Sequence, residues 1–118
     1  MNVGTSLKVI GAGVAWRTVG YEDAGETLLE AVSGDSEQER LLAGMSIVKA
    51  GERSIGLIGK ARESGRLTPT VVRLLADIGG PRSRVLLTEI AAEPGRLAEA
   101  AVASLDLLDR MEALGATD

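Results

Sequence analysis

Apolar residues recur along the chain with the spacing of one face of an α-helix. Three segments share an i, i+1, i+4, i+7 pattern and lie 30 residues apart. They are Leu41, Leu42, Met45 and Val48; Val71, Val72, Leu75 and Ile78; and Ala101, Val102, Leu105 and Leu108. Because this spacing puts side chains on one side of a helix, and no segment alternates with period two, the pattern predicts an all-α protein.

A second kind of apolar segment lies between these three. Gly51-Glu52-Arg53-Ser54 is followed by Leu57, Ile58 and Ala61, and Gly80-Pro81-Arg82-Ser83 is followed by Leu86, Leu87 and Ile90. A weaker copy begins at Gly20 and continues through Leu28, Leu29 and Val32. A fixed period of this length is typical of repeat proteins in which each unit is a pair of helices.

Start and stop signals divide the chain into short helices. Ser36 and Glu39 form a capping box, Thr68 precedes Pro69 as an N-cap, and Pro81 repeats the proline's role after Gly80. Four glycines are expected to end helices in the left-handed conformation, namely Gly34, Gly65, Gly95 and Gly115. The predicted helices are 5–19, 22–33, 36–49, 53–63, 69–79, 82–92 and 96–113. They form three hairpins and a final helix.

Two stretches resemble HEAT-like repeats of the short type first associated with phycobilin lyases. One runs from Ala50-Gly51-Glu52-Arg53-Ser54-Ile55 to Ala61, and the other from Leu75-Ala76-Asp77-Ile78-Gly79-Gly80-Pro81-Arg82 to Ala91. The chain departs from that pattern because its inter-helix turns lack Asp and the following helices lack a Val-Arg pair. The resemblance implies a short right-handed α-solenoid of about three and a half hairpins. It also implies that residues 1–118 form a single domain.

In such an array each hairpin buries its apolar face against its neighbours, because one hairpin cannot bury that face alone. The first and last helices have a neighbour on one side only, so they need a polar outer side. Helix 96–113 suits a terminal cap, since its charged residues form a polar outer side. Helix 5–19 has a nearly uncharged run from Val9 to Trp16. We expect the first hairpin to bury this run. The alternative is an exposed docking surface, through which the chain could form a homo-oligomer.

The residue inventory removes most familiar catalytic and metal chemistry. The chain has no Cys and no His, so disulfides, thiolate or imidazole metal sites and a histidine proton shuttle are excluded. Gly11 and Gly13 suggest a dinucleotide-binding turn, but Trp16 stands where a small residue is required. These glycines are better explained by close helix packing. The carboxylates of Asp106 and Asp109 share a helix face, which we interpret as solvated. We therefore predict no enzyme activity, no cofactor and no metal site.

Charge is unevenly distributed along the chain. Residues 1–48 carry three basic and seven acidic side chains, residues 49–84 carry eight and three, and residues 85–118 carry two and seven. The basic residues of the middle segment, here called the basic island, are Lys49, Arg53, Lys60, Arg62, Arg66, Arg73, Arg82 and Arg84. One interpretation is a solvated surface partly paired with Glu52, Glu63 and Asp77. The other is a patch that recognises an acidic protein segment.

The favoured function is a non-catalytic scaffold or adaptor that binds a protein partner through its concave helical face. In proteins that the chain resembles, the second helix of each hairpin lines this face, which would bring Glu26 and Glu30 next to Arg53, Lys60 and Arg82. The alternative is a nucleic-acid-associated accessory protein that uses the basic island. The net charge of −4 and the near absence of aromatic residues oppose it. A phycobilin lyase activity would need a tetrapyrrole cleft, which a chain of this length could provide only with a partner.

No stretch reaches the roughly 20 apolar residues that cross a membrane. Because no secretory signal is recognisable, we expect a cytoplasmic location.

Overall fold

The computed structural model describes the backbone of residues 3–116 and the side chains of residues 7–115. The described part of the chain folds into seven α-helices and contains no strand, which confirms the all-α prediction. The helices are α1 (Val3–Thr18), α2 (Glu22–Val32), α3 (Glu37–Ala50), α4 (Glu52–Glu63), α5 (Pro69–Ile78), α6 (Gly80–Ala92) and α7 (Arg96–Ala116). Every predicted helix is present, with its ends within three residues of the predicted positions.

The predicted side-chain caps are confirmed. The Ser36 hydroxyl accepts a hydrogen bond from the amide of Glu39 at 3.3 Å, and the Thr68 hydroxyl accepts one from the amide of Val71 at 3.3 Å. Each bond satisfies an amide that has no partner inside its own helix. The starts of α3 and α5 are therefore specified by residues in their own first turns.

The glycine prediction is only partly correct. Gly65 follows α4 with φ +68°, as expected for a left-handed cap. Gly95 has φ +134° but precedes α7, Gly34 has no positive φ, and Gly115 lies inside α7. At the end of α1 the cap is Gly20, whose amide donates to the carbonyl of Ala15 at 3.0 Å. Apolar periodicity alone did not distinguish glycines inside helices from those at their ends.

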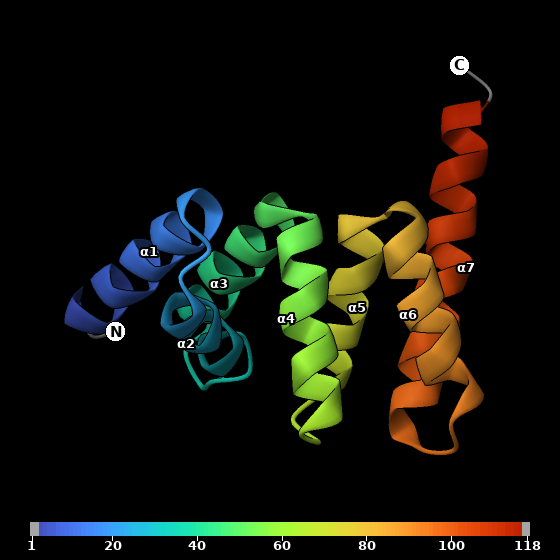
Figure 1. The fold of residues 1–118 in the computed structure, drawn as a ribbon, viewed down its shortest axis with the longest axis horizontal. Coiled ribbons are helices and arrows are strands. Elements are labelled where there is room, and N and C mark those ends of the chain that lie inside the picture. Colours follow the sequence, from blue (N-terminus) through green and yellow to red (C-terminus); the bar gives the residue numbers. More distant parts are fainter. Residues whose placement is uncertain (1–2, 117–118) are drawn as a thin grey trace.

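The helices lie in two layers (Figure 1). One layer contains α1, α3, α5 and α7, each packed against the next, and the other contains α2, α4 and α6. No two described helices that touch are more than three apart in chain order. One continuous core runs from Val9 in α1 to Leu108 in α7.

The buried face of each helix in the α2, α4 and α6 layer agrees with the predicted one. Its core residues repeat with a spacing of 29, from Leu28, Leu29 and Val32 to Leu57, Ile58 and Ala61, and then to Leu86, Leu87 and Ile90. In α5 the predicted Val71, Val72 and Leu75 are buried as well. The repeat therefore locates these faces correctly.

The buried face of α3 differs from the predicted one. Its buried residues are Ala43, Gly44 and Ile47, whereas Leu41 is 62% exposed and Met45 is 55% exposed. A Cβ atom on Gly44 would lie 3.7 Å from Leu74 and 3.8 Å from Val32, which are ordinary van der Waals contacts, so an alanine would fit at this position. Contacts with α1, α2 and α5 bury the side of α3 that carries Ala43 and Ile47 and leave Leu41 and Met45 on the surface. In α7 the pattern is also mixed, since Leu108 is buried but Val102 is exposed.

Helix α1 is buried on one side and exposed on the other. Val9 and Trp16 belong to the core, and Gly13 allows close approach of α3, because a Cβ there would lie 3.0 Å from Ser46 Cβ. Gly11 has no neighbour within 4 Å of such an atom, so close packing does not explain it. The outer side of α1 exposes Leu7, Ile10 and Val14. The expected burial is therefore found on one side of this helix, and a docking role for the exposed side stays a prediction.

Candidate functional site

Four of the eight cations of the basic island, Lys60, Arg62, Arg66 and Arg84, pair with carboxylates of neighbouring helices. Lys60 contacts Glu22 at 3.4 Å, Arg62 contacts Glu89 at 3.1 Å, and Arg62 also pairs with Glu93. These acids come from the acidic segments before and after the island. Among the described residues, none of these ion pairs involves the partners that the sequence suggested, Glu52, Glu63 and Asp77.

Two arginines of the island each contact two carboxylate oxygens. Arg66 binds both carboxylate oxygens of Glu26, one of them at 3.3 Å, and Arg84 reaches Asp109 at 2.8 Å and Glu112 at 2.6 Å. The hydrogen bond to Glu26 raises the pKa of the Arg66 guanidinium, and the one to Asp109 raises the pKa of Arg84. Both side chains keep their charge at any pH at which the fold would be studied, since even an unperturbed arginine is protonated there.

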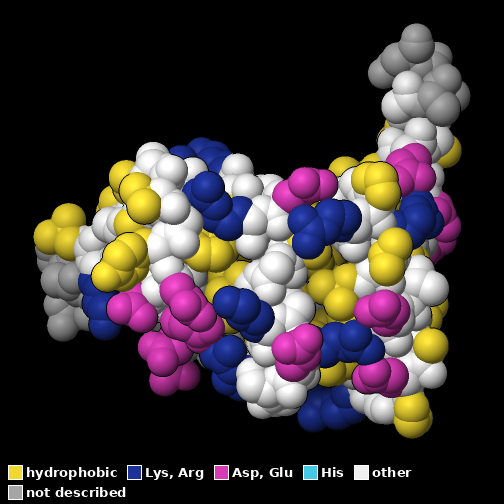
Figure 2. Space-filling view, viewed as in Figure 1, with side chains coloured by type: hydrophobic (Ala, Val, Ile, Leu, Met, Phe, Trp, Pro, Cys, Tyr) yellow, Lys and Arg dark blue, Asp and Glu magenta, His cyan; other side chains and the backbone are white. Residues whose placement is uncertain are grey.

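The surface of α2, α4 and α6 consequently carries both signs of charge. Figure 2 shows lysine, arginine, aspartate and glutamate interspersed over this face, with apolar side chains visible between the helices. The sequence predicted an acidic part of this face followed by a basic part. Ion pairs from Glu22 to Lys60 and from Glu26 to Arg66 join the two parts, although α2 itself carries four acidic residues and no basic one.

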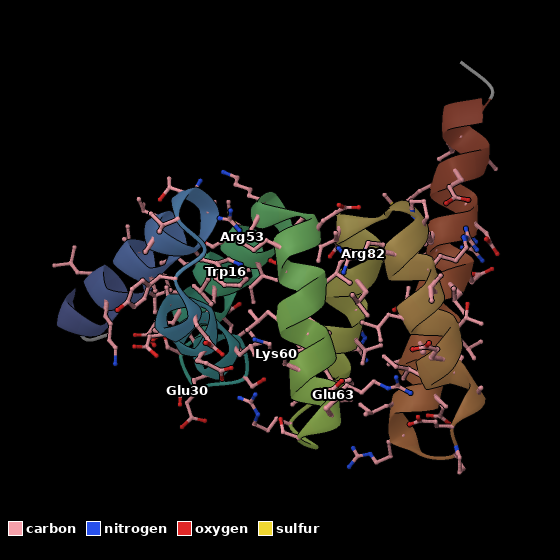
Figure 3. All side chains as sticks on the ribbon, in the orientation of Figure 1. Trp16, Glu30, Arg53, Lys60, Glu63 and Arg82 are labelled. Carbon is pink, nitrogen blue, oxygen red and sulfur yellow. The ribbon has the colours of Figure 1, made fainter. Side chains whose placement is uncertain are left out.

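Of the five residues predicted to bind a partner, Arg53 and Arg82 differ most in their surroundings. Figure 3 shows them near corresponding ends of α4 and α6. The Arg53 guanidinium donates to the carbonyl of Trp16 at 2.6 Å and packs beside Gly20, so it caps the end of α1. Arg82 is exposed and has no ion pair or side-chain hydrogen bond with any described residue. Arg53 is thus tied to the fold, whereas Arg82 points to a free surface.

The remaining three predicted residues lie on α2 and α4. Lys60 and Glu26 are held in the ion pairs with Glu22 and Arg66. Glu30 is exposed on the last turn of α2, and its charge also raises the pKa of Arg66. The structure brings Glu26 and Glu30 together around Arg66, a residue that was not among the predicted five.

An apolar groove between α3 and α5 was not predicted from the sequence. It has a volume of about 620 Å³, with Leu41, Met45 and Val48 along α3 and Leu74 on α5. Val32 and Gly44 also line it, and charged side chains stand around it: Glu37, Arg40, Lys49 and Asp77. A smaller hollow of about 280 Å³ lies beside Ile55, Arg82 and Val85. Only the first has the size and apolar lining of an ordinary ligand or peptide site.

One signal in the sequence could have pointed to this groove. Ala43 and Ile47 are four residues apart, so they form a second apolar face of α3 beside the one that carries Leu41, Met45 and Val48. If Ala43 and Ile47 face inward, the side chains of Leu41 and Met45 must turn toward solvent. The larger apolar residues then mark a surface and not a core.

The acidic pair on α7 is engaged in ion pairs. Asp106 pairs with Arg110 at 2.9 Å and Asp109 with Arg84 at 2.8 Å. Within residues 3–116, no group of three or more acidic, Cys or His side chains is arranged to hold a metal ion. None of the helices described is both long and apolar enough to span a bilayer.

The groove between α3 and α5 is therefore the candidate functional site, since it combines exposed apolar residues, a cavity and a charged surround. Comparison of the chain with protein families, with curated proteins and with solved structures finds no match.

Proposed function

We propose that this chain is a non-catalytic protein-interaction module that accepts an amphipathic helix of a partner in the groove between α3 and α5. The exposure of Leu41 and Met45 on the wall of a 620 Å³ groove is the observation that carries the proposal. Recognition of this kind places apolar residues at i, i+3 or i+4, and i+7 of the incoming helix into such a groove. The charged residues around the groove would select direction and register.

A short right-handed α-solenoid of HEAT-like hairpins is the architecture we propose for this module. Contacts restricted to helices near one another in chain order support it, as does the 29-residue spacing of the core. In such an array every unit adds surface without closing the structure, so a groove between successive helices stays open to a partner.

The surface of α2, α4 and α6 is a less favoured docking site. Four of its cations already contact carboxylates, so an acidic partner would have to displace existing ion pairs. The same pairing reduces the support for a nucleic-acid role, because phosphate binding needs several cations in a continuous track. The apolar groove involves no such competition.

Selection from a displayed library of amphipathic helical peptides tests the proposed function. We expect peptides enriched on the wild-type chain to share an i, i+4, i+7 apolar stripe and to lose at least about tenfold in affinity on Met45→Glu, as for loss of a central interface contact. The matched control is Val85→Glu, which introduces the same charge at an exposed apolar residue of α6. Peptides that bind wild type and Met45→Glu equally, or a library that yields no enrichment, would contradict the proposal.

A further inference from the structure

The outer sides of α1 and α3 form one exposed apolar surface. Its large side chains are 47–62% exposed, and they are Leu7, Ile10 and Val14 on α1 and Leu41 and Met45 on α3. Ile10 and Met45 line the same hollow of about 140 Å³ between the two helices, so the surface is continuous across them. We call it the α1–α3 face.

One end of the α1–α3 face is basic. The two helices run in the same direction (Figure 1), and a Cβ atom on Gly13 of α1 would lie 3.0 Å from Ser46 Cβ of α3, so residues 33 positions apart in the sequence lie level with each other. Arg17 and Lys49 stand in the last turns of α1 and α3, and both line the hollow between the helices. Lys8, the other charge described on α1, lies nine residues before Arg17 and so on the opposite side of the helix.

The other end of this face is acidic. Glu37 is exposed in the first turn of α3, and its carboxylate has no ion pair or hydrogen bond with a described residue. The neighbouring Arg40 is held on the carbonyl of Gly34 at 2.7 Å. Arg17 and Lys49 likewise have no ion pair within the described part of the chain. Three charges of the α1–α3 face are therefore available to a partner.

The apolar residues are arranged symmetrically between these two ends. The midpoint of Leu41 and Met45 is at position 43 of α3, and the midpoint of Leu7 and Val14 is level with a point half a residue beyond it. That difference is about 0.8 Å along the helix axis, at 1.5 Å per residue. A two-fold axis at this level therefore turns the apolar part of the α1–α3 face onto that of a second copy.

We propose that the α1–α3 face pairs with the same face of a second copy of the chain about this two-fold axis, with the helices of the two copies antiparallel. The axis brings Arg17 and Lys49 of each copy to the level of Glu37 of the other, so opposite charges meet at both ends. A parallel pairing would bring like charges together. The inference goes beyond the proposed function, because α1 does not line the groove between α3 and α5.

Exchange of charge between two full-length variants tests the pairing. Arg17→Glu and Glu37→Lys each place like charges at both ends of the two-fold interface. Mass in solution is measured by light scattering or sedimentation over a range of concentrations. We expect the wild-type chain to form a dimer as concentration rises, and each variant alone to dimerise at least about tenfold more weakly. The control is Arg82→Glu, which makes the same change at an exposed arginine of α6 and should dimerise as the wild type does.

A mixture of the two charge variants should recover the dimer. In the mixed dimer the new glutamate of one copy faces the new lysine of the other, and the second contact keeps the native Arg17 and Glu37. We therefore expect the mixture to dimerise at least about tenfold more tightly than either variant alone. This recovery separates a two-fold contact from a loss of folding in a single variant.

Val14→Glu tests the apolar part of the same contact. It charges the α1–α3 face and leaves the groove between α3 and α5 unchanged, because Val14 does not line that groove. We expect it to dimerise at least about tenfold more weakly than the wild type, whereas Val85→Glu on α6 should have no such effect. Peptides selected on the groove should still bind Val14→Glu, so failure of the pairing and failure of the proposed function are distinguishable.

Four results would overturn the inference. They are a wild-type chain that stays monomeric at all concentrations, a Val14→Glu variant that dimerises as the wild type does, a mixture no tighter than its components, and association that grows beyond a dimer, which a closed two-fold contact does not allow. If a variant loses its helical circular dichroism, Arg17→Gln or Val14→Gln replaces it. A monomeric wild-type chain that still binds the selected peptides would overturn this inference and leave the proposed function standing.

Discussion

Two serines one repeat apart offer a test of how the core is held together. Ser54 in α4 and Ser83 in α6 are both fully buried and occupy equivalent places after Gly51 and Gly80. The Ser54 hydroxyl accepts a hydrogen bond from the indole nitrogen of Trp16 at 3.0 Å and donates one to the carbonyl of Ile47 at 2.6 Å. The Ser83 hydroxyl has no hydrogen-bond partner among the described residues.

Replacing each serine with alanine should therefore give opposite results. Ser54→Ala leaves the indole N–H of Trp16 and the carbonyl of Ile47, near the end of α3, without their partner. At about 1–3 kcal/mol for each of these two buried groups left unsatisfied, the free energy of unfolding should fall by about 2–6 kcal/mol. Ser83→Ala removes a buried hydroxyl that has no partner to lose, so its effect should lie within about 1 kcal/mol of zero, or be stabilising.

Urea unfolding followed by tryptophan fluorescence measures both changes. Trp16 is the only tryptophan in the sequence and is buried, so its emission reports on the core that joins α1 to α4. For each variant, far-ultraviolet circular dichroism should give the same urea midpoint as tryptophan fluorescence. Agreement between the two probes is the test that unfolding is two-state. The reasoning would be refuted if Ser54→Ala were less than about 1 kcal/mol more destabilising than Ser83→Ala.

Two further matched pairs test single contacts by thermal or urea unfolding. Gly13→Ala should destabilise the fold by about 1–3 kcal/mol, because the new Cβ would lie 3.0 Å from Ser46 Cβ, whereas Gly11→Ala should stabilise it by about 0.5–1 kcal/mol, since that position is open. Equal effects of the two substitutions would disprove the close approach of α1 and α3. Arg53→Ala should cost about 1 kcal/mol through loss of its hydrogen bond to the carbonyl end of α1, and Arg82→Ala should change stability by less than about 0.5 kcal/mol. A stability loss of Arg82→Ala as large as that of Arg53→Ala would show that Arg82 also has a structural partner.

Local signals in the sequence were sufficient to predict the helices. The caps at Ser36 and Thr68 act through bonds to residues three positions away, so they depend on no distant part of the chain. The core of the α2, α4 and α6 layer was also predictable, because Leu57 and Leu86 repeat Leu28 with a spacing of 29. Helix ends depend on neighbouring residues, and the repeated core can be recognised by comparing one stretch of sequence with the next.

The charged residues show where sequence reasoning ended. The sequence predicted a basic island at residues 49–84 between two acidic segments. In the structure, carboxylates of these two segments form the ion pairs of the island. Glu26 and Arg66 lie 40 residues apart, and Arg84 and Glu112 lie 28 apart. No local pattern relates the members of such pairs, because they meet only when neighbouring helices pack.

The candidate site depended on the tertiary structure for the same reason. The sequence contains no Cys and no His, so it offers no thiolate or imidazole ligand. Helical periodicity also identified Leu41 and Met45 as members of an apolar face, but it could not decide whether that face is buried. Packing decided it, because α3 is contacted by α1, α2, α4 and α5, and these contacts bury the side of the helix that carries Ala43, Gly44 and Ile47. Leu41 and Met45 are then left on the surface, since a helix that buries one side turns the residues of its other side toward solvent, whatever their hydrophobicity.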